Sequence, residues 1–250
     1  DQKEWSVAGQ LYYSEVASSN DLTNEFLRSV NRSDFLTNEL KNNQIDKLSS
    51  VTKAGVKREI GGDLYFSNGK RFWFASFSHQ YVLDTELDAD LLRLMLNGNK
   101  PYAGETLAVP GSEYYSIYFN RLRAGMGFNL KLGNLIQTFS GSIGVIAGQN
   151  YDELNIARSS FFTHPNGDYL DVELHADTRL SDTSWAQITD ITGWGIGGDL
   201  YYSVLKKKSF FVSAEIKNIG FISWNKNPFE ASIDTNFVFN GLEVDTTENG

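Results

Sequence analysis

Long runs in which apolar and polar side chains strictly alternate constrain the fold of this chain more than any other feature. The clearest run covers residues 121–132, where Leu122, Ala124 and Met126 alternate with Arg121, Arg123 and Gly125. A repeat of two residues is that of a β-strand, because successive side chains point to opposite faces. Similar runs lie near residues 5–16, 54–66, 71–83, 136–148, 168–177, 192–205, 208–217 and 229–241. The sequence therefore predicts an all-β chain with nine or ten strands.

Several connections between these strands are short. Ser67-Asn68-Gly69-Lys70 carries the Asn-Gly pair of a type I′ hairpin turn, in which both central residues need a positive φ. Leu132-Gly133-Asn134 and Lys206-Lys207-Lys208 also read as short hairpin turns. Hairpins join antiparallel neighbours, so we expect an antiparallel sheet.

Two other connections are long and have helical periodicity. Residues 19–51 are polar, with Asp21 as the expected N-cap and apolar residues at helical spacing. Residues 84–111 predict a short amphipathic helix that contains Leu91, Leu92, Leu94 and Met95 and ends at Asn97-Gly98-Asn99. Long decorated loops at one end and tight turns at the other are typical of outer-membrane barrels.

The alternation alone also suits a soluble β-sandwich, whose strands bury one face. Three features favour a membrane barrel: aromatic residues near strand ends, polar faces of mixed glycine and charge, and strands long enough to cross a bilayer at a tilt. A strand that crosses needs about 9–11 residues, whereas strands in soluble proteins average about 5–6. The sandwich stays open as the alternative in which Trp194, Leu200 and Val204 form an interior core.

Five segments occur in the order found in an uncharacterised family of Bacteroidetes outer-membrane β-barrels. They are Leu96 to Gly104, Asn166 to Val172, Gly193 to Leu200, Ile216 to Trp224, and Phe239-Asn240-Gly241. Over roughly residues 50–245 the chain resembles this family, which is distantly similar to long-chain fatty-acid transporter barrels and to barrel subunits of the type IX secretion apparatus. The resemblance implies a bacterial outer-membrane location and a barrel of about 14 strands, with no catalytic residues to transfer. The chain then reads as a single barrel domain over residues 1–250, incomplete at one or both ends.

Composition and motifs argue against enzymatic chemistry. The absence of Cys excludes disulfides, thiolate metal sites and a thiol nucleophile, and a net charge of -9 without a basic block is unsuited to nucleic acid. Gly193-x-Gly195-x-x-Gly198 matches the dinucleotide fingerprint but runs into a predicted strand, where the fingerprint requires a helix. The alternating Asp171, Glu173, His175 and Asp177 could bind a metal, but a solvated polar face explains them better. We expect no enzyme, no catalytic residue, no cofactor and no metal.

The polar strand faces supply the candidate functional residues. We expect six charged side chains to face the barrel lumen: Arg121, Arg123, Lys131, Asp171, Glu173 and Asp199. Arg121 and Arg123, which share their register with Lys131, could form a cationic stripe for an anionic solute, or pair with Asp or Glu across the lumen and fill a narrow barrel. A change of register at Asn218-Ile219-Gly220 marks a candidate bulge.

Two functions follow from this interpretation. The first is transport of small hydrophobic compounds through a loop-gated barrel, with the helix of Leu91, Leu92, Leu94 and Met95 as the gate. The alternative is a structural or adaptor subunit of an outer-membrane secretion or assembly complex, in which that helix docks a partner. The expected partners are outer-membrane lipid and other outer-membrane or periplasmic subunits.

Overall fold

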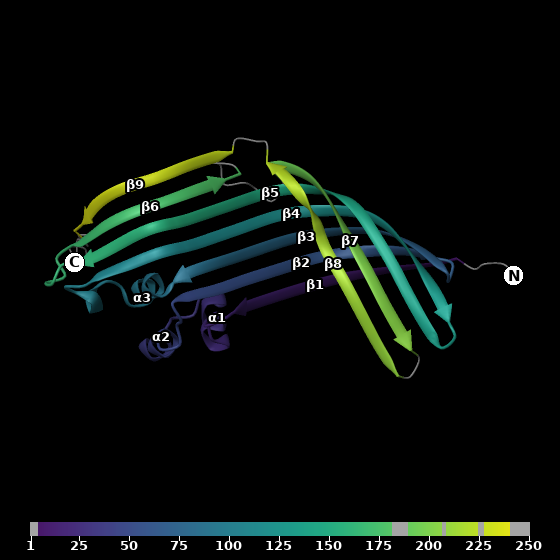
Figure 1. The fold of residues 1–250 in the computed structure, drawn as a ribbon, viewed down its shortest axis with the longest axis horizontal. Helices are drawn as coiled ribbons and strands as arrows, with labels where there is room; N and C mark the ends of the chain where they lie inside the picture. Colours follow the sequence, from purple (N-terminus) through teal and green to yellow (C-terminus); the bar gives the residue numbers. More distant parts are fainter. Residues whose placement is uncertain (1–4, 182–189, 207–208, 225–227, 241–250) are drawn as a thin grey trace, which may run out of the picture.

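The chain folds into one large antiparallel sheet of nine strands (Figure 1). The computed structural model describes residues 5–181, 190–206, 209–224 and 228–240. The strands are β1 (Ser6–Ser19), β2 (Val51–Ser67), β3 (Arg71–Asp88), β4 (Thr106–Leu132), β5 (Leu135–Thr163), β6 (Leu170–Leu180), β7 (Gly193–Lys206), β8 (Phe210–Trp224) and β9 (Phe229–Phe239). The predicted all-β antiparallel class is confirmed.

Strand β5 pairs with two successive strands on one side. Its first part, residues 135–148, pairs with β7, and its second part, residues 152–163, pairs with β6. Strand β8 then pairs with β7, and β9 pairs with β6. Strands β6 and β7 therefore occupy the place of one long strand, and β8 and β9 occupy the place of the next. In the described part of the chain the sheet does not close on itself, because β1, β8 and β9 each pair on one side only.

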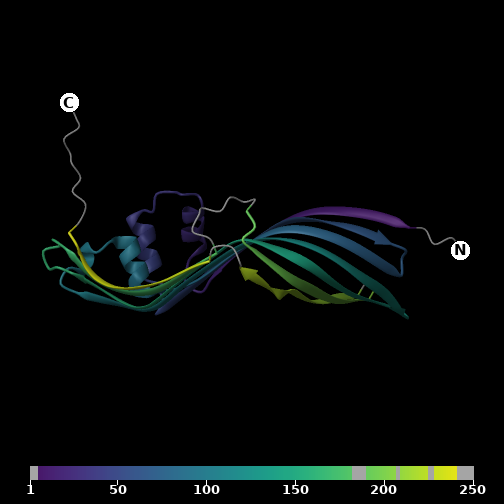
Figure 2. The same ribbon diagram turned by 90° about the horizontal axis from the view of Figure 1, so that it is seen from above.

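The sheet has two halves that are turned relative to each other about its middle (Figure 2). We call the half that carries the turns at 68–70 and 133–134 the hairpin half; β7 and β8 belong to it. We call the other half, on which the helices pack and to which β6 and β9 belong, the helical half (Figure 1).

The three α-helices are α1 (Asn24–Asn31), α2 (Asn38–Ile45) and α3 (Ala89–Asn97), and Lys100–Tyr102 form a 3₁₀ turn. The prediction that Asp21 caps the first helix is wrong, because Thr23 does so by accepting a hydrogen bond from the backbone N–H of Phe26 at 3.2 Å. Asp21 instead accepts hydrogen bonds from the backbone N–H and the hydroxyl of Ser49, at 3.0 and 2.6 Å. These bonds join the two ends of the insertion, by which we mean residues 20–50 between β1 and β2. Within the described ranges, none of the helices has the length and apolarity needed to cross a membrane.

The predicted helix of residues 91–96 is confirmed as α3, which ends at Gly98 with a φ of 70°. The hairpin at 68–70 is also present, but as a three-residue connection in which Gly69, and not Asn68, has a positive φ, so the type I′ prediction is wrong. Asn68 instead accepts a hydrogen bond from the backbone N–H of Arg71 through its side-chain oxygen, at 2.9 Å. Of the predicted turn at Lys206, the residues Lys207 and Lys208 lie outside the described residues.

Glycines on the strands make room for aromatic rings of their neighbours. A Cβ atom added to Gly125 would lie 2.2 Å from the ring of Phe74, and one added to Gly127 would lie 2.2 Å from the ring of Phe72. Because both contacts are far shorter than any van der Waals distance, these rings can lie flat on the sheet only over glycine. The glycine-rich 193–198 segment likewise lies within strand β7, as expected, and opens no helix.

Candidate functional site: a polar face behind an apolar one

Strand register assigns the side chains of the hairpin half to two faces, because residues paired across strands point the same way. Met126 is paired with Trp73 on one side and with Gly141 on the other, and Gly141 is paired with Leu200. We call the face of these residues the outer face. The inner face carries the alternate residues, among them Arg121, Arg123 and Asp199.

Burial is inverted on this half of the sheet. On the outer face the exposed fractions are 57% for Leu122, 69% for Ile143 and 56% for Leu200. On the inner face the charged Arg121 is 2% exposed and Asp199 is 7% exposed. Soluble proteins place large apolar residues inside and leave charged ones in water. The alternative in which Trp194, Leu200 and Val204 form an interior core does not hold for this structure, because Trp194 and Leu200 are more than half exposed and Val204 is only half-buried.

The apolar outer face has defined limits. One limit, beside the hairpin turns, is marked by Arg71 and Lys206. The other limit, near the middle of the sheet, is marked by the ion pair of Glu15 with Arg58. Between these two limits, no Asp, Glu, Lys or Arg among the described residues lies on the outer face. On β4 this band covers the ten steps from residue 122 to residue 132. Ten steps at about 3.3 Å each span roughly 33 Å along the strand. At a tilt of about 40° the band is then about 25 Å high, the height of the apolar band of membrane barrels.

Aromatic side chains gather at both limits of this band. Near the hairpin turns, Phe139 has its ring centre 5.3 Å from that of Phe128 and 4.6 Å from that of Tyr202. Near the middle of the sheet, Tyr81 and Tyr118 stack at 4.3 Å. Rings at such levels match the interfacial girdles of membrane proteins.

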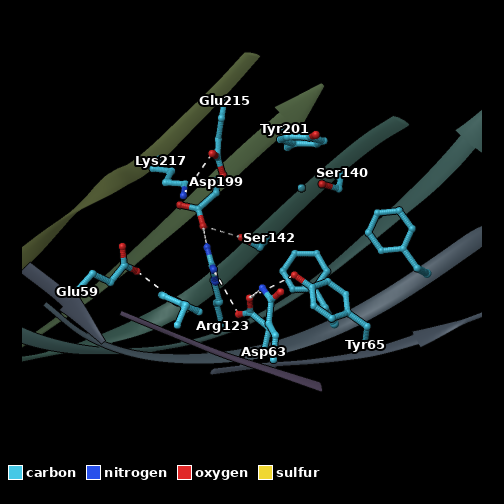
Figure 3. A pocket seen from close by; sticks show the side chains of 15 residues that line it. Glu59, Asp63, Tyr65, Arg123, Ser140, Ser142, Asp199, Tyr201, Glu215 and Lys217 are labelled. Carbon is cyan, nitrogen blue, oxygen red and sulfur yellow. Dashed lines mark hydrogen bonds and ion pairs between the residues drawn. The ribbon is translucent and has the colours of Figure 1, made fainter. Parts of the chain in front are cut away.

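The inner face of the hairpin half carries a connected set of ion pairs centred on Asp199. Its Oδ1 atom lies 2.9 Å from Nη1 of Arg121, and its carboxylate also contacts Arg123. Arg123 reaches Asp63 as well, with Nη2 3.6 Å from Oδ1 (Figure 3). Ser142 donates a hydrogen bond to Asp199 at 3.2 Å. Both arginines pair with a carboxylate, as expected, but not across a lumen: the pairs run along the sheet, from β4 over β5 to Asp199 on β7 and from β4 over β3 to Asp63 on β2.

A β-bulge in β8 completes this cluster. Gly198 is paired with Ile219 and Leu200 with Ile216, so two residues of β8 lie opposite Asp199 alone. One of them, Asn218, has a φ of 59°, and its backbone N–H donates to Oδ1 of Asp199 at 2.9 Å. The predicted bulge is therefore confirmed. It is hydrogen-bonded to Asp199 of the neighbouring strand and is one of three register shifts in the sheet's described pairings.

A hollow of about 380 Å³ opens on the inner face beside the cluster (Figure 3). Aromatic rings line one part of it: Tyr65, Phe72, Phe74 and Tyr201. Its charged lining, among the described residues, consists of Glu59, Asp63, Asp199, Glu215, Arg123 and Lys217. Sequence reasoning missed the aromatic lining and four of the charged residues: Glu59, Asp63, Glu215 and Lys217. The alternation of side chains predicts which face a residue lies on, but not which residues meet around a hollow.

Towards the middle of the sheet the inner face becomes apolar. Ile117, Phe119 and Ile146 pack together with exposed fractions of 6–9%, and Trp224 packs against them. Trp224 also stacks on Tyr151 at 5.6 Å. This ridge separates the polar hollow of the hairpin half from the helical half.

The structure does not bring the remaining predicted lumen residues to the cluster. Lys131 lies on β4 beside the turn at 133–134 and is exposed. Asp171 and Glu173 lie on β6 in the helical half, on the face opposite Val172, which is 4% exposed. The alternation predicts which face of a strand these residues lie on, but not how far they lie from Asp199 in the folded sheet.

His175 binds the carboxylates next to it. Its Nε2 atom lies 3.2 Å from Oε1 of Glu173, and its Nδ1 atom lies 3.0 Å from Oδ1 of Asp234 on β9. The hydrogen bond from His175 lowers the pKa of Glu173 below its ordinary value. Within the part of the chain that the structure describes, no group of three or more His, Asp or Glu is arranged to hold a metal ion.

The predicted gate or docking helix, α3, contacts β3, β4 and α2. Leu92 is its anchor, with an exposed fraction of 6%, whereas Met95 is 67% exposed. Leu91 and Leu94 are half-buried. The helix is thus packed on the helical half and presents Met95 to the outside.

Comparison with known proteins gives one match. No curated protein and no solved structure matches the chain. The model of a family of unknown function (DUF5723) matches residues 6–250. Since that match covers nearly the whole sequence, the chain belongs to this family.

Proposed function

We propose that the hairpin half forms part of the wall of a β-barrel in the bacterial outer membrane, with its outer face against lipid. The observation that carries this proposal is the inverted burial: Ile143 is 69% exposed while Arg121 is 2% exposed. Exposing such a face to water would cost a free energy of about 25 cal/mol for each Å² of apolar surface. Lipid removes that cost, and a sheet that closes into a barrel can cross lipid because all of its backbone groups then bond between strands.

We propose further that the barrel is a passage for small compounds, largely hydrophobic but with a polar end. The argument rests on how the charged side chains lie. A side chain that filled the lumen would project from the wall and, in a sheet open on that face, would be exposed. In the part of the chain that the structure describes, no second wall faces Arg121 and Asp199, and yet both are buried, so they lie along the sheet and leave the hollow beside them free.

The adaptor function is the alternative to passage. It is favoured by the length of the sheet, because the helical half extends past the apolar band and presents α1, α2 and α3. Purification in mild detergent separates the two functions. A stoichiometric partner, together with no solute flux in reconstituted vesicles, supports the adaptor, whereas flux of an amphiphile without a partner supports passage.

Single cysteine variants test the membrane wall, because the native chain contains no Cys. We choose Ile143→Cys and Leu200→Cys on the outer face, with Ser140→Cys and Ser203→Cys on the inner faces of the same two strands as matched controls. Each is labelled with an environment-sensitive fluorophore in vesicles that contain brominated lipid.

The expected result is strong quenching at positions 143 and 200 and weak quenching at positions 140 and 203. Equal quenching at all four, or a protein that stays in solution without detergent, would refute the membrane wall. The two positions on each strand are three residues apart, about 10 Å along the strand, and both lie at the level of the apolar band. A difference between the faces therefore reports lipid contact itself.

A further inference from the structure

The hollow on the inner face has an excess of negative charge once its ion pairs are matched. Asp199 is neutralised by Arg121, at 2.9 Å, and Asp63 is reached by Arg123, at 3.6 Å. The third pair is Glu215 with Lys217, whose charged atoms lie 3.2 Å apart. Each of these three pairs matches one carboxylate with one cationic side chain.

Glu59 is left over from this matching. In the described residues it has no ion-pair partner, and its Oε1 atom accepts hydrogen bonds from two neutral groups, Tyr12 at 3.2 Å and Gln80 at 3.1 Å. Gln80 is fully buried and also accepts from the side chain of Asn218 at 3.2 Å. Neutral donors position the carboxylate of Glu59 but leave its charge unbalanced at the edge of the hollow.

The carboxylate of Asp63 is the second negative group without a full set of partners. Asp63 is 8% exposed, and its Oδ2 atom accepts from Gln10 at 2.7 Å and from Tyr65 at 3.2 Å. Its Oδ1 atom is buried and has no hydrogen-bond donor in the described part of the chain, with Arg123 only at ion-pair distance, while the residue as a whole lines the hollow. Because Asp63 lines the hollow, its carboxylate adds a second negative group beside that of Glu59.

The aromatic lining supplies a complementary surface. The rings of Phe72 and Phe74 lie over Gly127 and Gly125, with their centres 6.4 Å apart, and Tyr65 lies 5.8 Å from Phe74. Flat rings accept both hydrocarbon and the edge of an organic cation, since the ring face is negative. The hollow thus offers carboxylates at one part and an apolar, cation-compatible wall at the other.

We infer that this hollow is a binding site for a cationic amphiphile, a compound with an ammonium group and a short hydrocarbon part. The ammonium lies between Glu59 and Asp63, and the hydrocarbon lies on Phe72 and Phe74. This inference deepens the proposed passage and rests on it for its biological use, but not for binding itself. It also excludes the cationic stripe for anionic solutes, because Asp199 and Asp63 already neutralise the two arginines.

The test compares two probes of equal chain length, hexylammonium, whose N–H groups can donate to the carboxylates, and hexanoate. The full chain is purified in an uncharged maltoside detergent, and each probe is titrated by calorimetry. We expect the cation to bind at least tenfold more tightly than the anion. Equal binding, tighter binding of hexanoate, or no binding of either probe would overturn the inference.

Three variants locate the site. Glu59→Gln keeps the shape and both hydrogen bonds but removes the unbalanced charge, so we expect about fivefold weaker cation binding, the upper range for a partly exposed ion pair. Asp63→Asn is expected to weaken binding at least as much. Asp171→Asn removes the same charge from an exposed site on β6 and should change nothing. If all three variants bind alike, the hollow is not the site.

The inference and the proposed passage fail in different ways. Cation binding without flux in vesicles would leave the site standing and refute passage. Flux without preference for the cation would refute the site and leave passage standing. Because Asp63→Asn also loosens Arg123, its fold is checked by far-UV circular dichroism, and Glu59→Gln gives the decision if Asp63→Asn fails to fold.

Discussion

Asp199 is the residue on which the inner face of the hairpin half depends most. It receives Arg121 at 2.9 Å, Ser142 at 3.2 Å and the backbone N–H of Asn218 at 2.9 Å, and it also contacts Arg123. The substitution Asp199→Asn keeps the shape and one acceptor oxygen but leaves two arginines beside a neutral group.

The expected loss follows from the partners that remain. Breaking a buried ion pair by neutralising one member costs about 3–5 kcal/mol. Arg123 keeps Asp63 at 3.6 Å, and Arg121 keeps a hydrogen bond to the side chain of Asn218. Because both arginines retain some compensation, we expect the lower end of that range, about 3 kcal/mol.

The assay is guanidinium unfolding in lipid vesicles, followed by tryptophan fluorescence. Asp171→Asn is the matched control, since it removes the same charge from an exposed position and should cost no more than about 0.5 kcal/mol. A double variant, Arg121→Met with Asp199→Leu, removes the pair together and is expected to lose less than the sum of its single variants. The reasoning is refuted if the free energy of unfolding of Asp199→Asn lies within 1 kcal/mol of that of the native chain. It is also refuted if the losses of the single variants Arg121→Met and Asp199→Leu add up to the loss of the double variant.

Three further outcomes follow from the contacts described. Gly127→Ala brings a Cβ within 2.2 Å of Phe72 and should destabilise the sheet by about 1–3 kcal/mol in the same unfolding assay, a loss that Phe72→Leu should relieve; no loss would show that the ring moves freely. Leu92→Ala should destabilise α3 by about 2–5 kcal/mol while Met95→Ala has little effect, as measured by hydrogen exchange of residues 89–97, and equal effects would contradict the packing of the helix. The hydroxyl of Ser49 holds the pKa of Asp21 below its ordinary value, so this carboxylate stabilises the insertion above the ordinary aspartate pKa, and that stabilisation is lost as the pH falls through the lowered pKa. Protease cleavage within residues 20–50 should therefore rise on acidification in the native chain and stay constant over that range in Asp21→Asn, and identical pH profiles would refute the role of Asp21.

The strands and their faces could be predicted because alternation is a local property. Leu122 and Arg121 point to opposite sides in any strand, and the sequence therefore indicated an apolar and a polar face before any pairing was known. The same reasoning found α3 and the bulge at Asn218, since Gly98 ends a helix and a change of register is visible within one segment.

The composition of the site could not be predicted in the same way. Arg121, Lys131 and Glu173 are all charged residues on alternating strands, and nothing local separates the one that is buried from the two that lie elsewhere. Their distance depends on long-range register, which sets Arg121 two strands away from Asp199 and leaves Glu173 in the other half of the sheet. The N-cap was missed for a related reason: Asp21 is bound by Ser49, a residue 28 positions away.

The interruption of the sheet at its middle has a mechanical consequence. Strand β5 runs through both halves as 29 residues, roughly 95 Å at 3.3 Å per residue. On the side of β5 that faces away from β4, the same length is divided between β6 and β7, and in the next position of the sheet between β9 and β8. Such a sheet is a plate that is stiff along one margin and notched along the other. Strands β1 to β5 connect the two halves without interruption, so we expect them to carry a load from the helical half to the hairpin half. We expect bending to concentrate at the notch, next to Trp224 and the apolar ridge.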